Sequence, residues 1–335
     1  MKCIALPRFG LEYLAECELE KPEPEKGEVL VRFGAASVNS RDLQIINGTF
    51  SPTQTLPIIP LSDGAGEVVA VGSDIKKLAE GDLVCPLFFP EWIAGEATTD
   101  ERSVSSGLEA PGVLREYGAY REHQVLKMPA FLDAGEAACF PCAGLTAWVS
   151  LANAHIGAGD WVLVQGTGGV SLFGLQFAKA LGASVIVTSG NKEKLERATL
   201  LGADAVINYS EDEQWGATAR DIADGLGVHA VLEIGGTGTL PQSIQALRRG
   251  GHINIIGYFA GIDVGLTVFD FIERNAHVHG LSVGSREDFE QMLDCVAEHE
   301  IHPVISRHYK FTEAAEAIAA IGAGRHFGKL VISIG

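Results

Sequence analysis

The sequence is short of basic side chains. Among its 335 residues, 25 Lys and Arg stand against 43 Asp and Glu, which gives a formal net charge of -18 at pH 7. Such a field repels phosphate backbones and anionic lipid headgroups. We therefore expect neither nucleic acid nor a membrane as the main partner, and predict a small-molecule substrate instead.

Long apolar runs and cysteine are scarce too. The apolar stretch at 252–269 is interrupted by His252, Asn254, Asp263 and glycines, so it falls short of the ~20 apolar residues of a membrane span. The first residues lack the apolar core and small-residue cleavage site of a signal peptide. We expect a cytoplasmic protein that begins at Met1. Six cysteines in so long a chain do not resemble a secreted disulfide framework, so we expect reduced thiols.

The chain is long enough for two domains, because single cores rarely exceed roughly 250 to 300 residues. Short strands at 29–38, 66–72 and 81–88, with frequent turn signals, predict a β-rich first region. From about residue 140 the pattern changes, and apolar strands at 161–165 and 183–189 each lead through a turn into a helix. Strands and helices that alternate in this way indicate an α/β fold with a parallel sheet covered on both faces.

A segment from 90 to 120 stands apart because it is polar and has little periodicity. Long segments of this kind are usually functional or mobile. Its acidic residues are Glu91, Glu96, Asp100, Glu101, Glu109 and Glu116. A cation site is one interpretation, but no ligand spacing is evident, so we favour a solvated excursion.

The sharpest motif lies between a predicted strand and a predicted helix. It reads Gly166-Thr167-Gly168-Gly169-Val170-Ser171, which is the setting of the dinucleotide fingerprint. Gly166 allows a tight turn and Gly168 lets the backbone approach a pyrophosphate, whose charge the helix N-terminus favours. Ser171 occupies the third glycine position and is small enough for helix-to-strand packing. A structural glycine turn would leave the clustered amides without a role.

The end of the next strand predicts which dinucleotide binds. Enzymes that use NAD place Asp or Glu there to bind the ribose hydroxyls, but this strand ends at Ser189 and continues into Asn191, Lys192 and Lys194. The missing acid removes repulsion toward a 2'-phosphate, and the lysines would attract it. Exposed lysines in a first helical turn are common, so the missing acid weighs more. We predict that Ser189, Asn191 and Lys194 help to bind NADP(H).

Ordered motifs along nearly the whole chain carry a resemblance to a known family. They are PLSDGAGEVVAVG (60–72), GDLV (81–84), AGLTAW (143–148), VLVQGTGGV (162–170), LGAD (201–204), LRRGGHINIIG (247–257), VHGLSVGS (278–285) and FGKLVI (327–332). The chain resembles a medium-chain dehydrogenase/reductase, and within that superfamily the zinc-independent quinone oxidoreductase-like members.

The resemblance implies a Rossmann doubly wound parallel sheet inserted in a GroES-like, β-rich catalytic domain. The catalytic domain would comprise 1–143 and 285–335, and the Rossmann domain 144–284. Members commonly pair through the edge of the Rossmann sheet, so a homodimer is expected.

Zinc-dependent members bind the catalytic ion through a Cys, a His and a Cys or Asp. Alignment on Asp42 places Asn39 at the first ligand position, and alignment on 64–66 places Ser62 at the second. Cys142 is the third, a thiol without its partners. The segment at 90–120 replaces the structural-zinc lobe and has no cysteine. We therefore predict no metal site.

The Cys139-Phe140-Pro141-Cys142 segment is a CxxC motif. It lacks both a thioredoxin-like setting and a second ligand pair, so we expect buried thiols.

Without zinc, the accessible chemistry is hydride transfer to an activated acceptor such as a quinone or an α,β-unsaturated carbonyl. The resemblance implies a set of residues around the nicotinamide and its ribose, which are Thr146, Gly235, Ile256, Gly257, Leu281 and Val283. Asn39 and Arg41 are the candidates for contacting the carbonyl oxygen. For Arg41, a salt bridge to Asp42 or another acid is an equally good interpretation.

Two other functions remain open on the sequence alone. They are a zinc-dependent alcohol dehydrogenase and a low-turnover NADPH-binding sensor or structural protein. An enoyl-thioester reductase is a close variant of the main hypothesis.

Overall fold

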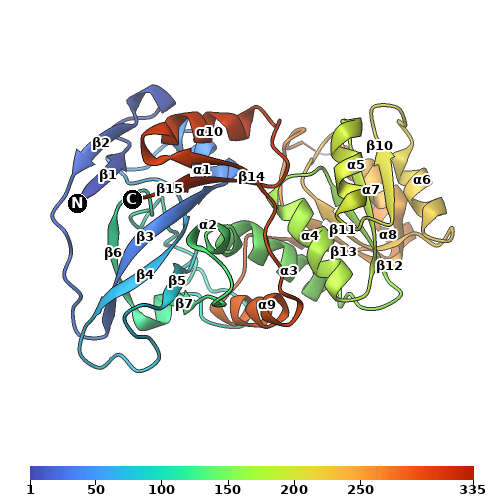
Figure 1. The fold of residues 1–335 in the computed structure, drawn as a ribbon. Helices are drawn as coiled ribbons and strands as arrows, with labels where there is room; N and C mark the ends of the chain where they lie inside the picture. The colour runs from blue at the N-terminus through green and yellow to red at the C-terminus, as the bar shows by residue number, and fades with distance from the viewer. Residues whose placement is uncertain (264) are drawn as a thin grey trace. The chain divides into compact units, whose positions relative to one another are not determined.

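The computed structural model describes residues 1–263 and 265–335, and it divides into two compact units. The first unit is made of residues 1–145 and 283–335, and the second of residues 146–282. The borders expected from the resemblance were 143/144 and 284/285. The α/β fold class is confirmed, with a mixed sheet in the first unit and a parallel sheet in the second (Figure 1).

The first unit is built on a sheet with strand order β14-β15-β3-β4-β5-β7, and β6 also pairs with β3. A separate two-stranded sheet pairs β1 with β2. The strands are β1 (Lys2–Ala5), β2 (Ala15–Glu18), β3 (Glu28–Val38), β4 (Asp63–Val71), β5 (Leu83–Pro86), β6 (Tyr117–Arg121), β7 (Val125–Lys127), β14 (Ile305–Lys310) and β15 (Lys329–Ser333). The helices are α1 (Ser40–Ile46), α2 (Ala134–Ala137), α9 (Arg286–His299) and α10 (Ala314–Gly322), with short turns η1 (Leu11–Tyr13), η2 (Glu122–Gln124), the π-helix η3 (Phe140–Gly144) and η4 (Phe311–Glu313).

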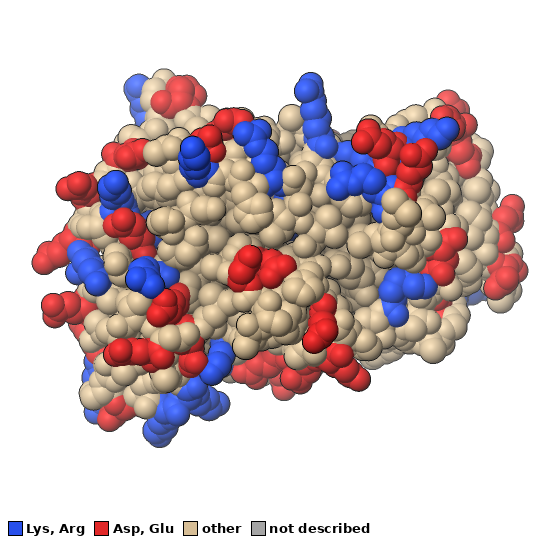
Figure 2. All heavy atoms as spheres, viewed as in Figure 1, with Lys and Arg blue, Asp and Glu red and all other residues tan. Residues whose placement is uncertain are grey.

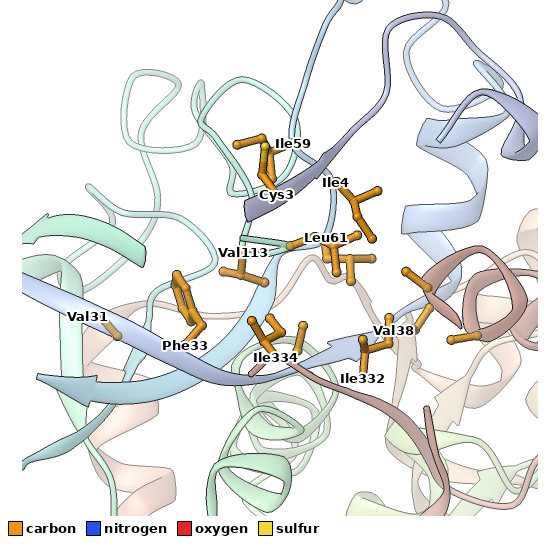
Figure 3. Packing of buried hydrophobic residues seen from close by; sticks show 14 of the residues in the cluster. Cys3, Ile4, Val31, Phe33, Val38, Ile59, Leu61, Val113, Ile332 and Ile334 are labelled. Carbon is orange, nitrogen blue, oxygen red and sulfur yellow. The ribbon is translucent and has the colours of Figure 1, made fainter. Parts of the chain in front are cut away.

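Buried apolar residues of β3 contribute to the core of this unit. Val31, Phe33 and Val38 belong to one buried cluster with Ile332 and Ile334 from the C-terminal end of the chain (Figure 3). The antiparallel register of β3 with β15 brings the two ends of the sequence together, with Val38 opposite Leu330. The C-terminal segment is therefore part of the first unit, as the resemblance implied.

The second unit is a six-stranded parallel sheet with order β10-β9-β8-β11-β12-β13. Its strands are β8 (Trp161–Gln165), β9 (Ser184–Ser189), β10 (Ala205–Asn208), β11 (Val228–Glu233), β12 (Leu247–Ile255) and β13 (His277–Gly280). Its helices are α3 (Leu145–Asn153), α4 (Gly169–Ala180), α5 (Lys192–Leu200), α6 (Trp215–Ile222), α7 (Leu240–Ala246) and α8 (Val268–Arg274). This is the doubly wound order, in which the chain reverses direction across the sheet between β8 and β11.

Different helices of this unit pack against different strands. Helices α4 and α5 pack against β8, β9 and β10, whereas α7 packs against β11 and β12. The strands predicted at 161–165 and 183–189 match β8 and β9 closely. Strand β12 begins at Leu247, directly after α7 ends at Ala246.

The expectation of six reduced cysteines is wrong for one pair. Cys3 and Cys17 form a disulfide, because they lie opposite each other in the register of β1 and β2. No local pattern predicts that pairing, because the register of β1 with β2 creates it. Cys85, Cys139, Cys142 and Cys295 are free thiols, and burial raises the pKa of Cys139 to about 12.

The segment at 90–120 is more ordered than a solvated excursion. Leu108, Val113 and Leu114 are buried, and Val113 donates its backbone N–H to the Leu61 carbonyl. Two of its acids accept from nearby hydroxyls, Glu109 from Ser105 at 2.8 Å and Glu101 from Thr98 at 2.7 Å. Across the described residues, no group of three or more potential ligands is arranged to hold a metal ion.

Among the described residues, no helix is both long and apolar enough to cross a membrane. On the face shown in Figure 2, basic side chains are interspersed with acidic ones rather than gathered into a single patch.

Candidate cofactor and catalytic sites

The fingerprint turn lies between β8 and α4, as predicted. Gly166 has a φ of +70°, which favours glycine, and its N–H donates to the Thr188 carbonyl at 2.7 Å. Gly168 is the N-cap of α4, so Gly169 and Val170 begin the helix. The N–H groups of a first turn have no partners within the helix and point toward any anion placed there.

Close packing of α4 on the sheet depends on a glycine outside the fingerprint. Ser171 is buried and donates its hydroxyl to the Gln165 carbonyl at 2.5 Å. One turn later, a Cβ on Gly174 would lie 2.6 Å from Leu232 Cδ2 and 3.2 Å from Val164 Cγ1. Gly174 therefore takes the packing role of the third fingerprint glycine. Its position three residues after Ser171, on the same face of the helix, could have indicated this role from the sequence.

Strand β9 ends at Ser189, and α5 begins at Lys192. Ser189 is buried, and its Oγ accepts from the Asn191 N–H at 3.2 Å. Asn191 is the N-cap of α5, and its side-chain Oδ1 accepts from the Lys194 backbone N–H at 3.0 Å. Partial burial lowers the pKa of Lys194, and the positive charge of Arg197 lowers it further.

Two residues after β10 belong to this site although sequence reasoning missed them. A Cβ on Gly190 would lie 2.7 Å from Ser210 Oγ and 2.8 Å from Tyr209 Cε2. Strand β10 pairs in parallel with β9, with Asn208 opposite Ser189. Residues just after both strands therefore meet at the carboxyl edge of the sheet, and the phenol of Tyr209 is about half exposed there.

A buried carboxylate lies where the strand order reverses. Glu233 Oε2 accepts from Gln165 Nε2 at 2.7 Å and from the Ser243 hydroxyl. Its Oε1 accepts from the N–H groups of Gly235 at 2.8 Å and Gly236 at 3.0 Å, and from the Thr239 hydroxyl. Glu233 thereby ties the end of β8 to the loop after β11. In doubly wound sheets, ligands bind at this reversal.

The remaining residues expected around the nicotinamide lie in the second unit, except Val283. Thr146 is buried in α3, and its carbonyl accepts from the Ser150 hydroxyl at 2.8 Å. The N–H of Ile256 donates to the Glu233 carbonyl, and that of Leu281 to the Ile255 carbonyl. A Cβ on Gly257 would lie 2.7 Å from the Ile234 carbonyl oxygen. Val283 has a φ of +59° and is buried in the first unit.

The first unit holds a buried polar cluster around Asn39. Lys329, which begins β15, donates from Nζ to Asn39 Oδ1 at 2.5 Å and to the Val38 carbonyl at 2.9 Å. Asn39 donates its backbone N–H to Asp42 Oδ2 at 2.7 Å. Burial raises the pKa of Asp42 to about 7, while the Arg41 guanidinium opposes that rise. Sequence reasoning named Asn39 but missed Lys329, which is 290 residues away.

Asp63 joins two further residues to the cluster. Its Oδ1 accepts from the Ser62 hydroxyl at 2.7 Å, and its Oδ2 accepts from the Cys142 N–H at 3.0 Å. Burial raises the pKa of Asp63, and the Lys329 charge opposes that shift. All three positions at which zinc-dependent relatives would carry ligands, Asn39, Ser62 and Cys142, therefore belong to one buried network.

Among the described residues Arg41 is held by hydrogen bonds rather than by the salt bridge that was the alternative expectation, and its contact with a substrate carbonyl stays a prediction. It donates from Nη1 to the Ser106 carbonyl at 2.9 Å and from Nη2 to Ser105 Oγ at 2.6 Å. Its guanidinium lies 4.4 Å from the centroid of the Phe88 ring. Arg41 thus fastens the segment at 90–120 to the start of α1, and the described residues show no ion pair between it and Asp42.

Known families match both parts of the chain. An alcohol dehydrogenase GroES-like domain matches residues 25–130, and a zinc-binding dehydrogenase domain matches residues 169–298. A zinc-type alcohol dehydrogenase-like protein of Schizosaccharomyces pombe is 40% identical over 97% of this chain and 96% of its own.

The chain belongs to the medium-chain dehydrogenase/reductase superfamily.

Two solved members extend the comparison. The structure described as an NAD-dependent alcohol dehydrogenase is 32% identical, covers 100% of both chains and has a TM-score of 0.91. A quinone oxidoreductase from Coxiella burnetii is 28% identical, covers 100% of this chain and 99% of its own, and has a TM-score of 0.80. This member of the superfamily is accordingly an oxidoreductase with a nicotinamide cofactor.

The zinc that the family description implies does not fit the residues present. A catalytic zinc site needs three protein ligands drawn from thiolate, imidazole and carboxylate. Here the three positions offer an amide, a hydroxyl and a thiol whose pKa burial raises well above its usual range. The amide oxygen and the hydroxyl are already hydrogen-bonded to Lys329 and Asp63. This dehydrogenase therefore lacks a ligand set for zinc at that position.

Proposed function

We propose that this protein is an NADPH-dependent, zinc-independent reductase that transfers hydride to an activated carbonyl compound, a quinone or an α,β-unsaturated carbonyl. The observation that carries the proposal is the buried Lys329–Asn39 contact at the position where zinc-dependent relatives need a ligand. A simple ketone needs strong polarisation before it accepts hydride. A conjugated acceptor spreads the developing charge itself.

The preference for NADPH rests on the carboxyl edge of β9. Ser189 replaces the acid that NAD-dependent enzymes use for the ribose hydroxyls, and Lys194 and Arg197 both place positive charge on the adjoining helix. A 2'-phosphate would relieve the repulsion between these cations. Tyr209 and Ser210 supply a phenol and a hydroxyl beside Gly190 for the same phosphate or the adenine.

The chain's own residues have distinct tasks in this proposal. The amides at the start of α4 bind the pyrophosphate, and Glu233 holds the loop at 235–236 in shape. When bound, the nicotinamide supplies the hydride and is oxidised. Arg41 orders the segment at 90–120 and, with Asn39, contributes positive potential for the incipient oxyanion of the acceptor. The final proton comes from solvent, since no histidine lies within these contacts.

The test is oxidation of NADPH by a panel of quinones, enones and enoyl thioesters. We expect turnover with at least one acceptor and a higher kcat/KM for NADPH than for NADH. Gly168→Asp is the matched control, because Gly168 has an extended conformation that Asp also adopts, and Asp is a good N-cap. Its carboxylate would repel the pyrophosphate, weakening NADPH binding about a hundredfold while the fold is kept.

Other outcomes point to the rival functions. Tight NADPH binding without oxidation of any acceptor would indicate a sensor or structural protein. Oxidation of simple alcohols that depends on added zinc would indicate an alcohol dehydrogenase, the activity named for several relatives.

We also propose a homodimer through the second unit. Strand β13 ends the parallel sheet, and its outer edge has no strand partner in the described chain. Helix α8, which packs against the neighbouring strand β12, exposes Val268, Phe269 and Ile272, each by two thirds or more. An apolar edge of this kind favours pairing. Elution as a monomer at every concentration in gel filtration would contradict the dimer.

A further inference from the structure

Three histidines gather on one face of the second unit's sheet, at its last strand. His252 lies on β12, and His277 and His279 lie on β13. His252 pairs with His277 in the parallel register, and His279 follows two residues later, so all three side chains project from the same face. The centroid of the His252 ring lies 4.6 Å from that of His277 and 5.2 Å from that of His279. None of the three belongs to the cofactor site or to the cluster around Asn39.

The contacts of this histidine cluster favour neutral rings. His252 Nδ1 lies 3.0 Å from His279 Nε2. A hydrogen bond between them needs one donor and one acceptor, and an imidazole that carries protons on both nitrogens can only donate. The groups that lower the pKa of His252 after burial itself are all basic, namely His277, His279, His155 in the turn after α3, and Arg248 on β12. A second proton in the cluster therefore breaks the contact and adds a like charge.

The cluster lies at the free edge of the sheet. Strand β13 ends the strand order, and its outer edge has no strand partner among the described residues. Two copies that pair this strand in antiparallel fashion are related by a two-fold axis perpendicular to the sheet, so each face stays on its own side. Residues that lie opposite each other then project from the same face. The joined sheets would therefore carry the three histidines of each copy on one continuous face.

We propose that the histidines at 252, 277 and 279 make this pairing proton-sensitive, so that neutral rings let two copies pair and protonated rings separate them. The inference rests on the homodimer proposed above. Because each copy brings its rings toward those of the other, protonation costs more in the dimer than in the monomer. The monomer then binds more protons. The dimer is therefore favoured above the titration range of the histidines and is lost as the pH falls through it.

The net charge of the chain predicts the opposite trend. Two copies with a formal charge of -18 repel each other at pH 7, and this repulsion weakens as the pH falls toward the isoelectric point. Pairing that depends on net charge alone would become tighter in acid. The direction of the change therefore shows which effect controls pairing.

The test is the dissociation constant of the dimer, measured by sedimentation equilibrium at constant ionic strength between pH about 7.5 and pH about 5.5, with circular dichroism to verify folding. We expect the Kd of the wild type to rise by about tenfold or more as the pH falls, since one extra proton bound by the separated copies gives tenfold for each pH unit. His277→Gln combined with His279→Gln removes two titrating rings, and its Kd should stay constant or fall. His299→Gln is the matched control, at an exposed histidine that ends α9 in the first unit, and it should behave as the wild type.

A wild-type Kd that stays constant or falls would overturn the proposal, as would an equal rise in the double variant. Should the double variant fail to pair at neutral pH, the direction of the wild-type trend decides alone. Protein that is monomeric at every pH and concentration would refute the homodimer and this regulation together, whereas a dimer with a constant Kd would refute only the role of the histidines. Reductase assays at neutral pH test the proposed chemistry separately.

Discussion

Each unit buries carboxylates, and the two units compensate them by different means. In the second unit, Glu233 is fully buried and accepts from five neutral donors, two of them backbone N–H groups. In the first unit, Asp63 accepts from two neutral donors and depends in addition on the charge of Lys329. Hydrogen bonds alone can stabilise a buried carboxylate when the backbone N–H groups of a turn donate to it. Where too few donors surround the carboxylate, a buried cation stabilises its charge.

The difference predicts that Lys329→Met has the largest effect on stability. The change leaves Asn39 Oδ1 and the Val38 carbonyl without their donor and the two aspartates without their cation. We expect a loss of about 3 to 5 kcal/mol in the free energy of unfolding, measured by denaturant titration. Lys179→Met removes a lysine from a half-exposed pair and should cost less than about 1 kcal/mol. Similar losses for the two variants would contradict the importance of Lys329.

Glu233→Gln tests the network of the second unit, in which neutral donors alone compensate the buried carboxylate. The new amide would present an NH₂ group to donors that now meet an oxygen, so at least one hydrogen bond becomes a donor–donor contact. We expect a loss of about 2 kcal/mol together with weaker dinucleotide binding, because the turn at 235–236 loses its anchor. Glu101→Gln, at an exposed carboxylate that accepts from Thr98, is the control and should change neither quantity measurably. Unchanged NADPH affinity in Glu233→Gln would show that the anchor does not serve the cofactor.

Lys194→Gln separates phosphate recognition from general binding. We expect the Kd for NADPH to rise about tenfold and the Kd for NADH to stay the same, as measured by fluorescence titration. Lys192→Gln, at the start of the same helix, removes an equal charge and should have a smaller effect. The pKa of Lys194 is lowered in the free protein, so NADPH binding should raise it, and affinity should fall as the pH rises through the lowered pKa. Equal losses for both dinucleotides would argue against a 2'-phosphate site.

The smallest effect is expected at the edge of the second unit's sheet. His252 on β12 lies 3.0 Å from His279 on β13, ring nitrogen to ring nitrogen, and its ring stacks on His277. Burial lowers the pKa of His252 to about 4, and the positive charges of His277, His279, His155 and Arg248 contribute.

This lowered pKa links the histidine to stability. The unfolded chain takes up the proton first, so stability is lost as the pH falls from about 6.5 to about 4. Because the rings are partly exposed, we expect a loss of about 1 kcal/mol. His252→Gln should flatten the decline in melting temperature over this range. Asp42 contributes with the opposite sign, so the difference between variant and wild type is the quantity to compare. An identical decline in both would contradict the assignment.

The dinucleotide site and the cluster around Asn39 also differ in how much of each could be predicted from the sequence. The dinucleotide site was predictable because its turn, its strand ends and its cap are contiguous, at 166–171 and 188–194. Even there, Gly174 and Tyr209 escaped notice, since their roles come from helix packing and from the parallel pairing of β9 with β10.

The cluster around Asn39 was only half predictable. Its members come from four distant segments, and they meet because β3 pairs with both β4 and β15. No local pattern marks Lys329 as buried, and its position before LVIS reads as an ordinary strand start. The Cys3–Cys17 disulfide was missed for the same reason, because the register of β1 and β2 creates it. Arg41 was named as a candidate, but its partners Ser105 and Ser106 lie in a segment without periodicity.

The most direct test of the account is to measure zinc content and NADPH-dependent reduction of a quinone or enone on the same preparation of wild-type protein, before and after treatment with a strong chelator. We predict substoichiometric zinc, turnover with NADPH, and no change in kcat/KM after chelation. One zinc per chain, with activity that is lost on chelation and restored by zinc, would contradict the account.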